Sequence, residues 1–116
     1  MRIALVGMFL ALTFGNSVAF AADCGEVPHQ PPFIPNGETA GEEGIRVARN
    51  AVVKYSAEVD NYLTCMDGRA TNILPYLTKE QKARWEEDLA DLHDKRRDIQ
   101  NEMNLAIRSY RNANSN

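Results

Sequence analysis

The sequence predicts an all-α protein: an antiparallel two-helix hairpin with an extended proline-rich N-terminal arm pinned by a disulfide. Two long segments, 39–67 and 78–112, repeat apolar residues at alternating steps of three and four, the period of an amphipathic helix. Four prolines fall within the arm, 22–38, and exclude helix there. Cys24 and Cys65 are the only cysteines, which predicts a single disulfide.

Residues 1–21 have the features of a cleavable export signal. A basic residue follows the initiator methionine, an apolar run spans 3–14, and 19–21 has the small-x-small pattern of a cleavage site. The apolar run is shorter than the roughly 20 residues that cross a bilayer. We therefore expect an exported protein, periplasmic or extracellular, with no stable membrane anchor after cleavage. Lipidation of Cys24 is the competing interpretation, but Asp23 occupies a position where lipoprotein signals have a small residue.

Removal of the signal leaves a small and mildly acidic chain. The full sequence has 116 residues and a net charge of −3, and the signal contains one of its 13 basic residues. The remaining 95 residues therefore carry 12 basic and 16 acidic residues, a charge of −4. This balance gives no basic surface for nucleic acid. A chain of this size is marginal for a single core and often depends on a covalent crosslink or a partner.

The first helix is expected over 39–67. Thr39 and Glu42 have the spacing of a capping box, which predicts the helix start. Gly68 is expected to end the helix, because glycine is common directly after the last helical residue. The apolar stripe between these ends, including residues that widen it, is Ile45, Val47, Ala48, Ala51, Val52, Tyr55, Val59, Tyr62, Leu63 and Met66.

The connection is expected over 68–77, because it contains a proline that interrupts helical hydrogen bonding. The second helix, 78–112, begins at Thr78 with a capping partner at Gln81, and 113–116 form a disordered tail. One arginine interrupts the apolar stripe of this helix, which consists of Trp85, Leu89, Leu92, Arg96, Ile99, Met103, Ala106 and Tyr110, with Ile107 beside it.

Two helices joined by ten residues most simply form an antiparallel hairpin with coiled-coil-like packing. Counting outward from the connection places Tyr62 near Trp85 and Ala48 near Ile99. The second helix then extends beyond the first and leaves part of its stripe uncovered. We expect an interaction surface here that consists of Phe33 and Ile34, as candidate cover from the arm, and of Ala106, Ile107 and Tyr110.

The pairing of Cys24 with Cys65 is compatible with chain length. Cys65 lies 25 residues beyond Ala40, roughly 37 Å along a helix. The 16 residues from Cys24 to Ala40 reach roughly 50 Å as polyproline, so the arm can run back along the hairpin. Closing this loop contributes roughly 4 kcal/mol in the chain-entropy model. An intermolecular disulfide is the alternative, and a redox-active pair lacks the C-x-x-C spacing.

No combination of polar residues predicts a reaction, a cofactor or a bound metal. His29 and His93 lack the spacing of metal ligands. Acidic residues of the second helix alternate with basic ones, as Asp91 does with Lys95, which is typical of a solvated helix face. No triad arrangement and no glycine-rich phosphate loop is present in the sequence. We therefore expect a non-catalytic protein without a cofactor or a metal site.

Four aromatic residues and one arginine leave two interpretations open. Trp85, Tyr55, Tyr62 and Tyr110 can form either an aromatic ligand groove or, as their stripe spacing favours, part of the core. Arg96 within the stripe either requires a carboxylate partner that fixes the register or lays its apolar stem over the hairpin edge.

An ordered set of residues spans nearly the whole chain after the signal. It consists of Cys24, Pro28, Pro32, Pro35-Asn36-Gly37, Ala40, Tyr62-Leu63-Thr64-Cys65 and Leu77-Thr78-Lys79-Glu80-Gln81. With this set the chain resembles a group of small exported proteobacterial proteins of no established function, which implies a fold and a compartment. Leu77, Thr78 and Gln81 also match the LTxxQ motif of the Spy and CpxP type of periplasmic helical chaperones and stress sensors, which typically carry the motif twice.

Two classes of function follow from these features. The first is a structural or interaction module, which uses its apolar stripe for a protein partner or for self-association. The second is a chaperone-like or stress-sensing hairpin that offers the same stripe to unfolded proteins. Both classes require an exposed apolar face, so the sequence does not separate them.

Overall fold

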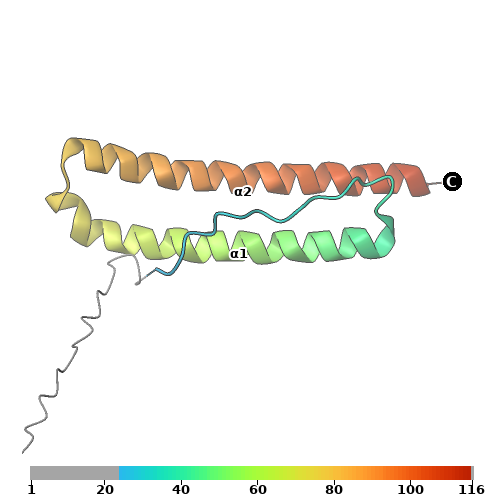
Figure 1. Cartoon of the computed structure of the whole chain (residues 1–116), viewed down its shortest axis with the longest axis horizontal. Coiled ribbons are helices and arrows are strands. Elements are labelled where there is room, and N and C mark those ends of the chain that lie inside the picture. The colour runs from blue at the N-terminus through green and yellow to red at the C-terminus, as the bar shows by residue number, and fades with distance from the viewer. Residues whose placement is uncertain (1–23, 116) are drawn as a thin grey trace, which may run out of the picture.

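The structure is a computed structural model and describes residues 24–115 (Figure 1). The expected export signal, 1–21, lies outside this range, together with the first two residues of the expected arm and Asn116. The described chain contains no strand, and its elements are α1 (Gly41–Ile73), the short 3-10 helix η2 (Leu74–Tyr76) and α2 (Lys79–Asn114). The all-α prediction is confirmed.

The two long helices lie side by side and antiparallel (Figure 1). Apolar side chains at helical spacing pack between them, and Val59 in the middle of α1 is fully buried. Every member of this core belongs to a stripe predicted from the sequence, and the helical hairpin is confirmed. The buried residues are Ile45, Ala48, Val52, Tyr55, Val59, Leu63, Leu92, Ile99, Met103 and Ala106.

The start of α2 was predicted correctly. The backbone N–H of Gln81 donates to the Thr78 hydroxyl oxygen at 3.2 Å, and the backbone N–H of Thr78 donates to Oε1 of Gln81 at 2.9 Å. These reciprocal bonds form a capping box that satisfies two backbone donors at the end of the connection. At its other end α2 continues to Asn114, so the first two residues of the expected tail, 113–116, are helical.

The expected capping box at the start of α1 is wrong. The N-cap is Ala40, without a side-chain capping hydrogen bond, and the chain enters the helix through Gly41 at a φ of 72°. A turn precedes it, in which the carbonyl oxygen of Asn36 accepts from the N–H groups of Thr39 at 3.2 Å and Ala40 at 2.9 Å. Thr39 therefore belongs to this turn, one residue before the capping position.

The expected end of the first helix at Gly68 is also wrong. α1 continues through Gly68 to Ile73, so the connection is shorter than the predicted 68–77. Gly68 does not have the positive φ of a helix-terminating glycine. A glycine inside a helix costs only about 1 kcal/mol, which the packing of a long helix outweighs. The helix ends instead beside Pro75, which lies in the first turn of η2.

The longer α1 shifts the register of the hairpin. The expected pairing of Tyr62 with Trp85 would place position 87 opposite Asp60. In the structure Asp60 forms an ion pair with Arg96, nine residues farther along α2. The helices therefore overlap more completely than the sequence suggested.

The expected overhang of α2 is absent from the described chain. Ile45, near the start of α1, lines one groove together with Ile107 and Tyr110. Ala106 is buried in the core at 7% exposure. Because α1 reaches the last turns of α2, the hairpin itself covers this part of the stripe.

A disulfide joins Cys24 to Cys65 within the chain. Their Cα atoms are 5.6 Å apart, although the residues are separated by 41 positions in the sequence. The bond attaches the start of the described chain to the C-terminal half of α1. It closes a loop that runs from Cys24 through the first part of α1 to Cys65.

The residues between Cys24 and α1 run without helix along the pair of helices (Figure 1). The Lys95 ammonium on α2 donates to the carbonyl oxygen of His29 at 3.5 Å. Farther along, Gly37 is buried against α2, and a Cβ at this position would overlap the carbonyl oxygen of Ala106. The close approach of the two backbones therefore requires glycine at position 37.

Candidate functional site

A cavity of about 350 Å³ lies near the disulfide, between the start of the described chain and both helices. We call it the aromatic cavity. Its size falls within the range of small-ligand pockets and suits one or two apolar side chains. The apolar part of its lining is Val27, Tyr62, Met66, Trp85, Leu89 and Leu92.

Each wall of the aromatic cavity follows from local structure. The α2 wall residues repeat at steps of four and three, and the two from α1 are one turn apart, so each group lines one side of its helix. The third wall depends on the crosslink. Because Cys24 is bonded to Cys65, the nearby Val27 is held against the helices. There its side chain is half-buried and packs against the core.

The rim of the cavity is polar. His29, Asp88, Asp91 and Lys95 complete the lining. An apolar centre with a charged rim is the usual organisation of a protein-binding surface.

Burial raises the pKa of the Tyr62 hydroxyl, while Arg69 lowers it and Asp88 raises it further. Tyr62 is therefore neutral at physiological pH and can donate a hydrogen bond from the wall of the cavity. Burial also raises the pKa of Tyr55 in the core, where Arg96 acts in the opposite direction. The hydroxyl of Tyr55 is buried without a hydrogen-bond partner among the described residues.

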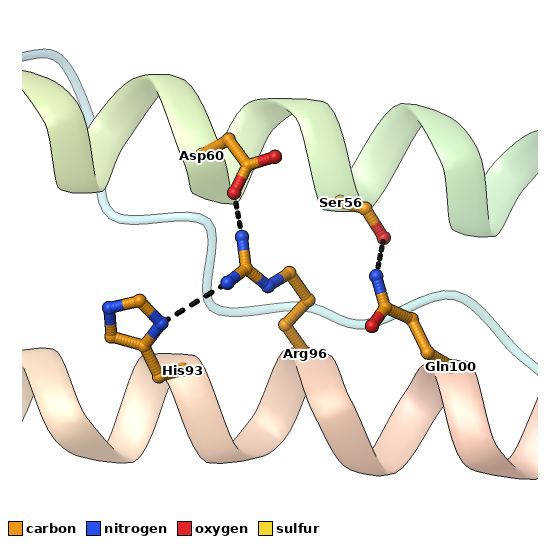
Figure 2. A network of polar contacts seen from close by, with 5 residues as sticks. All are labelled: Ser56, Asp60, His93, Arg96 and Gln100. Carbon is orange, nitrogen blue, oxygen red and sulfur yellow. Dashed lines mark hydrogen bonds and ion pairs between the residues drawn. The ribbon is translucent and has the colours of Figure 1, made fainter.

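A second set of polar contacts joins the helices directly (Figure 2). One guanidinium nitrogen of Arg96 donates to Asp60, and another lies 3.1 Å from Nδ1 of His93. The side-chain amide of Gln100 donates to the Ser56 hydroxyl at 3.0 Å. Of the two interpretations of the stripe arginine, the carboxylate partner is therefore the one that the structure shows.

The arm and the polar contacts lie on opposite faces of the hairpin. The arm passes in front of the helix pair in Figure 1 and behind the polar side chains in Figure 2. We call the two sides the covered face and the bridged face. Tyr62 and Cys65 of α1 belong to the covered face, and Ser56 and Asp60 to the bridged face.

The five residues of the expected interaction surface are not grouped as predicted. Phe33 is 84% exposed and covers nothing, whereas Ile34 packs partly against the core. Gly37, rather than an apolar side chain, contacts Ala106. The remaining members are buried or half-buried in the hairpin: Ala106, Ile107 and Tyr110.

The sequence left four aromatic residues as either a groove or, as favoured, part of the core. Of these, Tyr62 and Trp85 line the aromatic cavity, whereas Tyr55 lies in the core and Tyr110 lies at the other end of the hairpin. Val27 and the polar rim were missed, since their position depends on where the arm crosses the helices. The usable signal was the disulfide, which brings residues near Cys24 to the same end.

Within residues 24–115, no group of three or more His, Cys, Asp or Glu side chains is arranged to hold a metal ion. None of the helices in this range combines the length and apolar character of a membrane span.

Comparison of the chain with family models, curated proteins and solved structures gave no match.

Proposed function

We propose that this protein is an exported, non-catalytic interaction module that binds apolar side chains of a protein partner in the aromatic cavity. In this proposal the disulfide pins the arm along the hairpin and so maintains the third wall. The observation that carries the proposal is the cavity, with walls from three segments, an apolar centre and a charged rim. Export is supported by the signal-like residues 1–21 and by a disulfide, which persists in oxidising compartments.

Burial of the apolar stripe favours a cavity over the stripe as the binding surface. The ten core residues, which were expected to offer an open stripe, lie within a single chain. Self-association through the stripe, or capture of unfolded proteins by it, would require the hairpin to open. The aromatic cavity, by contrast, is accessible while the hairpin remains closed.

Peptide selection on the oxidised chain lacking the signal tests this function. We expect enriched peptides to share a large apolar or aromatic residue. Because Trp85 is the only tryptophan, binding should shift its emission to shorter wavelength. Met66→Glu, which places a charge in the cavity wall, should abolish binding.

Tyr76→Ser is the matched control for this experiment. Tyr76 is 87% exposed and does not line the cavity, so its replacement should leave peptide affinity unchanged. Circular dichroism and intact mass should show that both variants fold and keep the disulfide. Peptides that bind the Met66→Glu variant as tightly as the parent would contradict the proposal. Protection of an aggregating client at equimolar protein would instead support the chaperone-like class.

A further inference from the structure

A second groove lies at the opposite end of the hairpin, where α1 begins and α2 ends. Its volume is about 600 Å³, and its lining contains three arginines and no acidic residue. We call it the basic groove. It shares no lining residue with the aromatic cavity.

The floor of the basic groove is apolar and belongs to the core. Ile45 is a buried core residue with 9% exposure, and Ile107 and Tyr110 pack partly against the same core. A ligand that covers the half-buried Ile107 and Tyr110 removes further apolar surface from water at about 25 cal/mol per Å².

The three arginines around this floor are Arg49, Arg108 and Arg111. None of them takes part in an ion pair within the described chain. Within residues 24–115, no carboxylate therefore lies within ion-pair distance of these three guanidinium groups.

The basic groove continues the bridged face, away from the arm. On α2 its residues extend the line of the polar contacts at steps of four, four, three and four: Arg96, Gln100, Asn104, Ile107 and Arg111. Since the arm lies on the other face, a ligand can reach the groove while the arm remains in place (Figures 1 and 2).

We propose that the basic groove binds a single-chain anionic amphiphile, a carboxylate joined to an apolar chain as in a medium-chain fatty acid. The carboxylate accepts paired N–H bonds from a guanidinium group, and the chain lies over the floor residues. The charge of three arginines and the apolar floor together match this class of ligand.

The hydrogen-bonding character of the lining argues against a peptide as the occupant. A bound peptide brings backbone N–H groups that need acceptors. Arginine side chains only donate, so the lining offers few side-chain acceptors, chiefly the amide oxygen of Asn104 and the Tyr110 hydroxyl. A fatty acid has no N–H donor and makes no such demand.

Calorimetric titration of the oxidised chain lacking the signal tests this inference. Dodecanoate, used below its critical micelle concentration, should bind with one molecule per chain. Dodecanol should bind at least tenfold more weakly, and dodecyltrimethylammonium should not bind. Raising the salt concentration should weaken dodecanoate binding, because part of its affinity is electrostatic.

The arginines are tested by Arg108→Ala combined with Arg111→Ala. Loss of the guanidinium group that pairs with the carboxylate, and of a second positive charge beside it, should weaken dodecanoate binding by about tenfold or more. Arg46→Ala is the matched control, since Arg46 is an exposed arginine at the same end that does not line the groove. If the double variant does not fold, Arg49→Gln together with the salt series carries the same test.

Three outcomes would overturn the inference. Equal binding of dodecanol or of the cationic amphiphile would show simple apolar adsorption. Unchanged affinity in the folded arginine variants would place the ligand elsewhere. Binding only to phosphatidylglycerol vesicles, or tighter binding of an acidic peptide than of dodecanoate, would identify another class of occupant. Failure of this inference would leave the proposed function of the aromatic cavity standing, because the two sites share no lining residue and the peptide experiment tests the cavity separately.

Discussion

The covered face and the bridged face of the hairpin are held by different forces. On the covered face a disulfide joins Cys24 to Cys65, and the backbone at Gly37 lies directly against α2. On the bridged face the contacts are exposed side-chain pairs, and Asp60 in the main pair is 65% exposed. Exposed pairs contribute about 0.2–1 kcal/mol, whereas a disulfide of this loop length contributes about 4 kcal/mol. Of the two faces, the covered face therefore contributes more to stability.

Removal of the disulfide should have the largest effect. Cys24→Ser combined with Cys65→Ser should lower the free energy of unfolding by about 4 kcal/mol, because the unfolded chain regains the entropy that the crosslink removes. Urea denaturation followed by circular dichroism measures this loss. Dithiothreitol should destabilise the parent chain by a similar amount and leave the double variant unchanged. A loss below about 1 kcal/mol would show that the covered face does not dominate stability.

Gly37→Ala should have the next largest effect. The new Cβ would overlap the carbonyl oxygen of Ala106. It would also lie 2.8 Å from the carbonyl carbon of Ala106 and 2.9 Å from Cβ of Ser109, so the backbone at position 37 must move away from α2. Overpacking of this kind costs about 1–3 kcal/mol. Hydrogen exchange should increase at the amides of Thr39 and Ala40, which donate to the Asn36 carbonyl in the turn next to this contact, while the disulfide remains intact by mass. Unchanged exchange at these two amides would contradict the close contact between Gly37 and α2.

Gly68→Ala should stabilise the protein by about 0.5–1 kcal/mol, because alanine is the better residue inside a helix. Gly68 is interior to α1, and a Cβ there would meet nothing within 4 Å. The substitution therefore measures the helix itself, apart from contacts on either face. Urea denaturation decides the sign. Destabilisation would instead indicate the positive φ of a terminating glycine at position 68.

The spacing of apolar residues predicted the core correctly, because this spacing reflects only which residues of one helix share a face on neighbouring turns. All ten buried apolar residues fall in the predicted stripes, and the disulfide within the chain, which chain length allowed, is present. The end of α1 was missed because the local preference of Gly68 is weaker than the packing that continues the helix to Ile73. The predicted register was then wrong as well, because it was counted outward from a connection placed too early in the sequence.

The arm was harder to predict because its contacts are distant in sequence. Phe33 was expected as candidate cover for the end of α2 because the arm must approach Ala40 at that end, yet Phe33 is exposed. The backbone approaches α2 so closely at Gly37 that no side chain fits there. The aromatic cavity was only partly recognised for the same reason, because Val27 reaches it through the crosslink at Cys24.

The contribution of the bridged face can be isolated with a double-mutant cycle on Asp60 and Arg96. We expect a coupling free energy of about 0.5 kcal/mol between Asp60→Ala and Arg96→Ala, falling further as salt is raised. The Arg96 side chain is only 18% exposed, but its partner Asp60 is well solvated. Water around Asp60 screens its charge and so limits the attraction between the two side chains. Urea denaturation of the parent, both single variants and the double variant gives the four free energies.

Asp94 and Arg97 provide the matched control cycle, since they form an ion pair within α2 that does not connect the two helices. Their coupling should be equal to or smaller than that of Asp60 with Arg96. A coupling above about 2 kcal/mol for the interhelical pair would exceed the range of exposed pairs and reverse the ranking of the two faces. A coupling near the expected value would leave Asp60 and Arg96 as a contact that favours this register, because any other register separates the two charges. The covered face would then remain the more stabilising of the two faces.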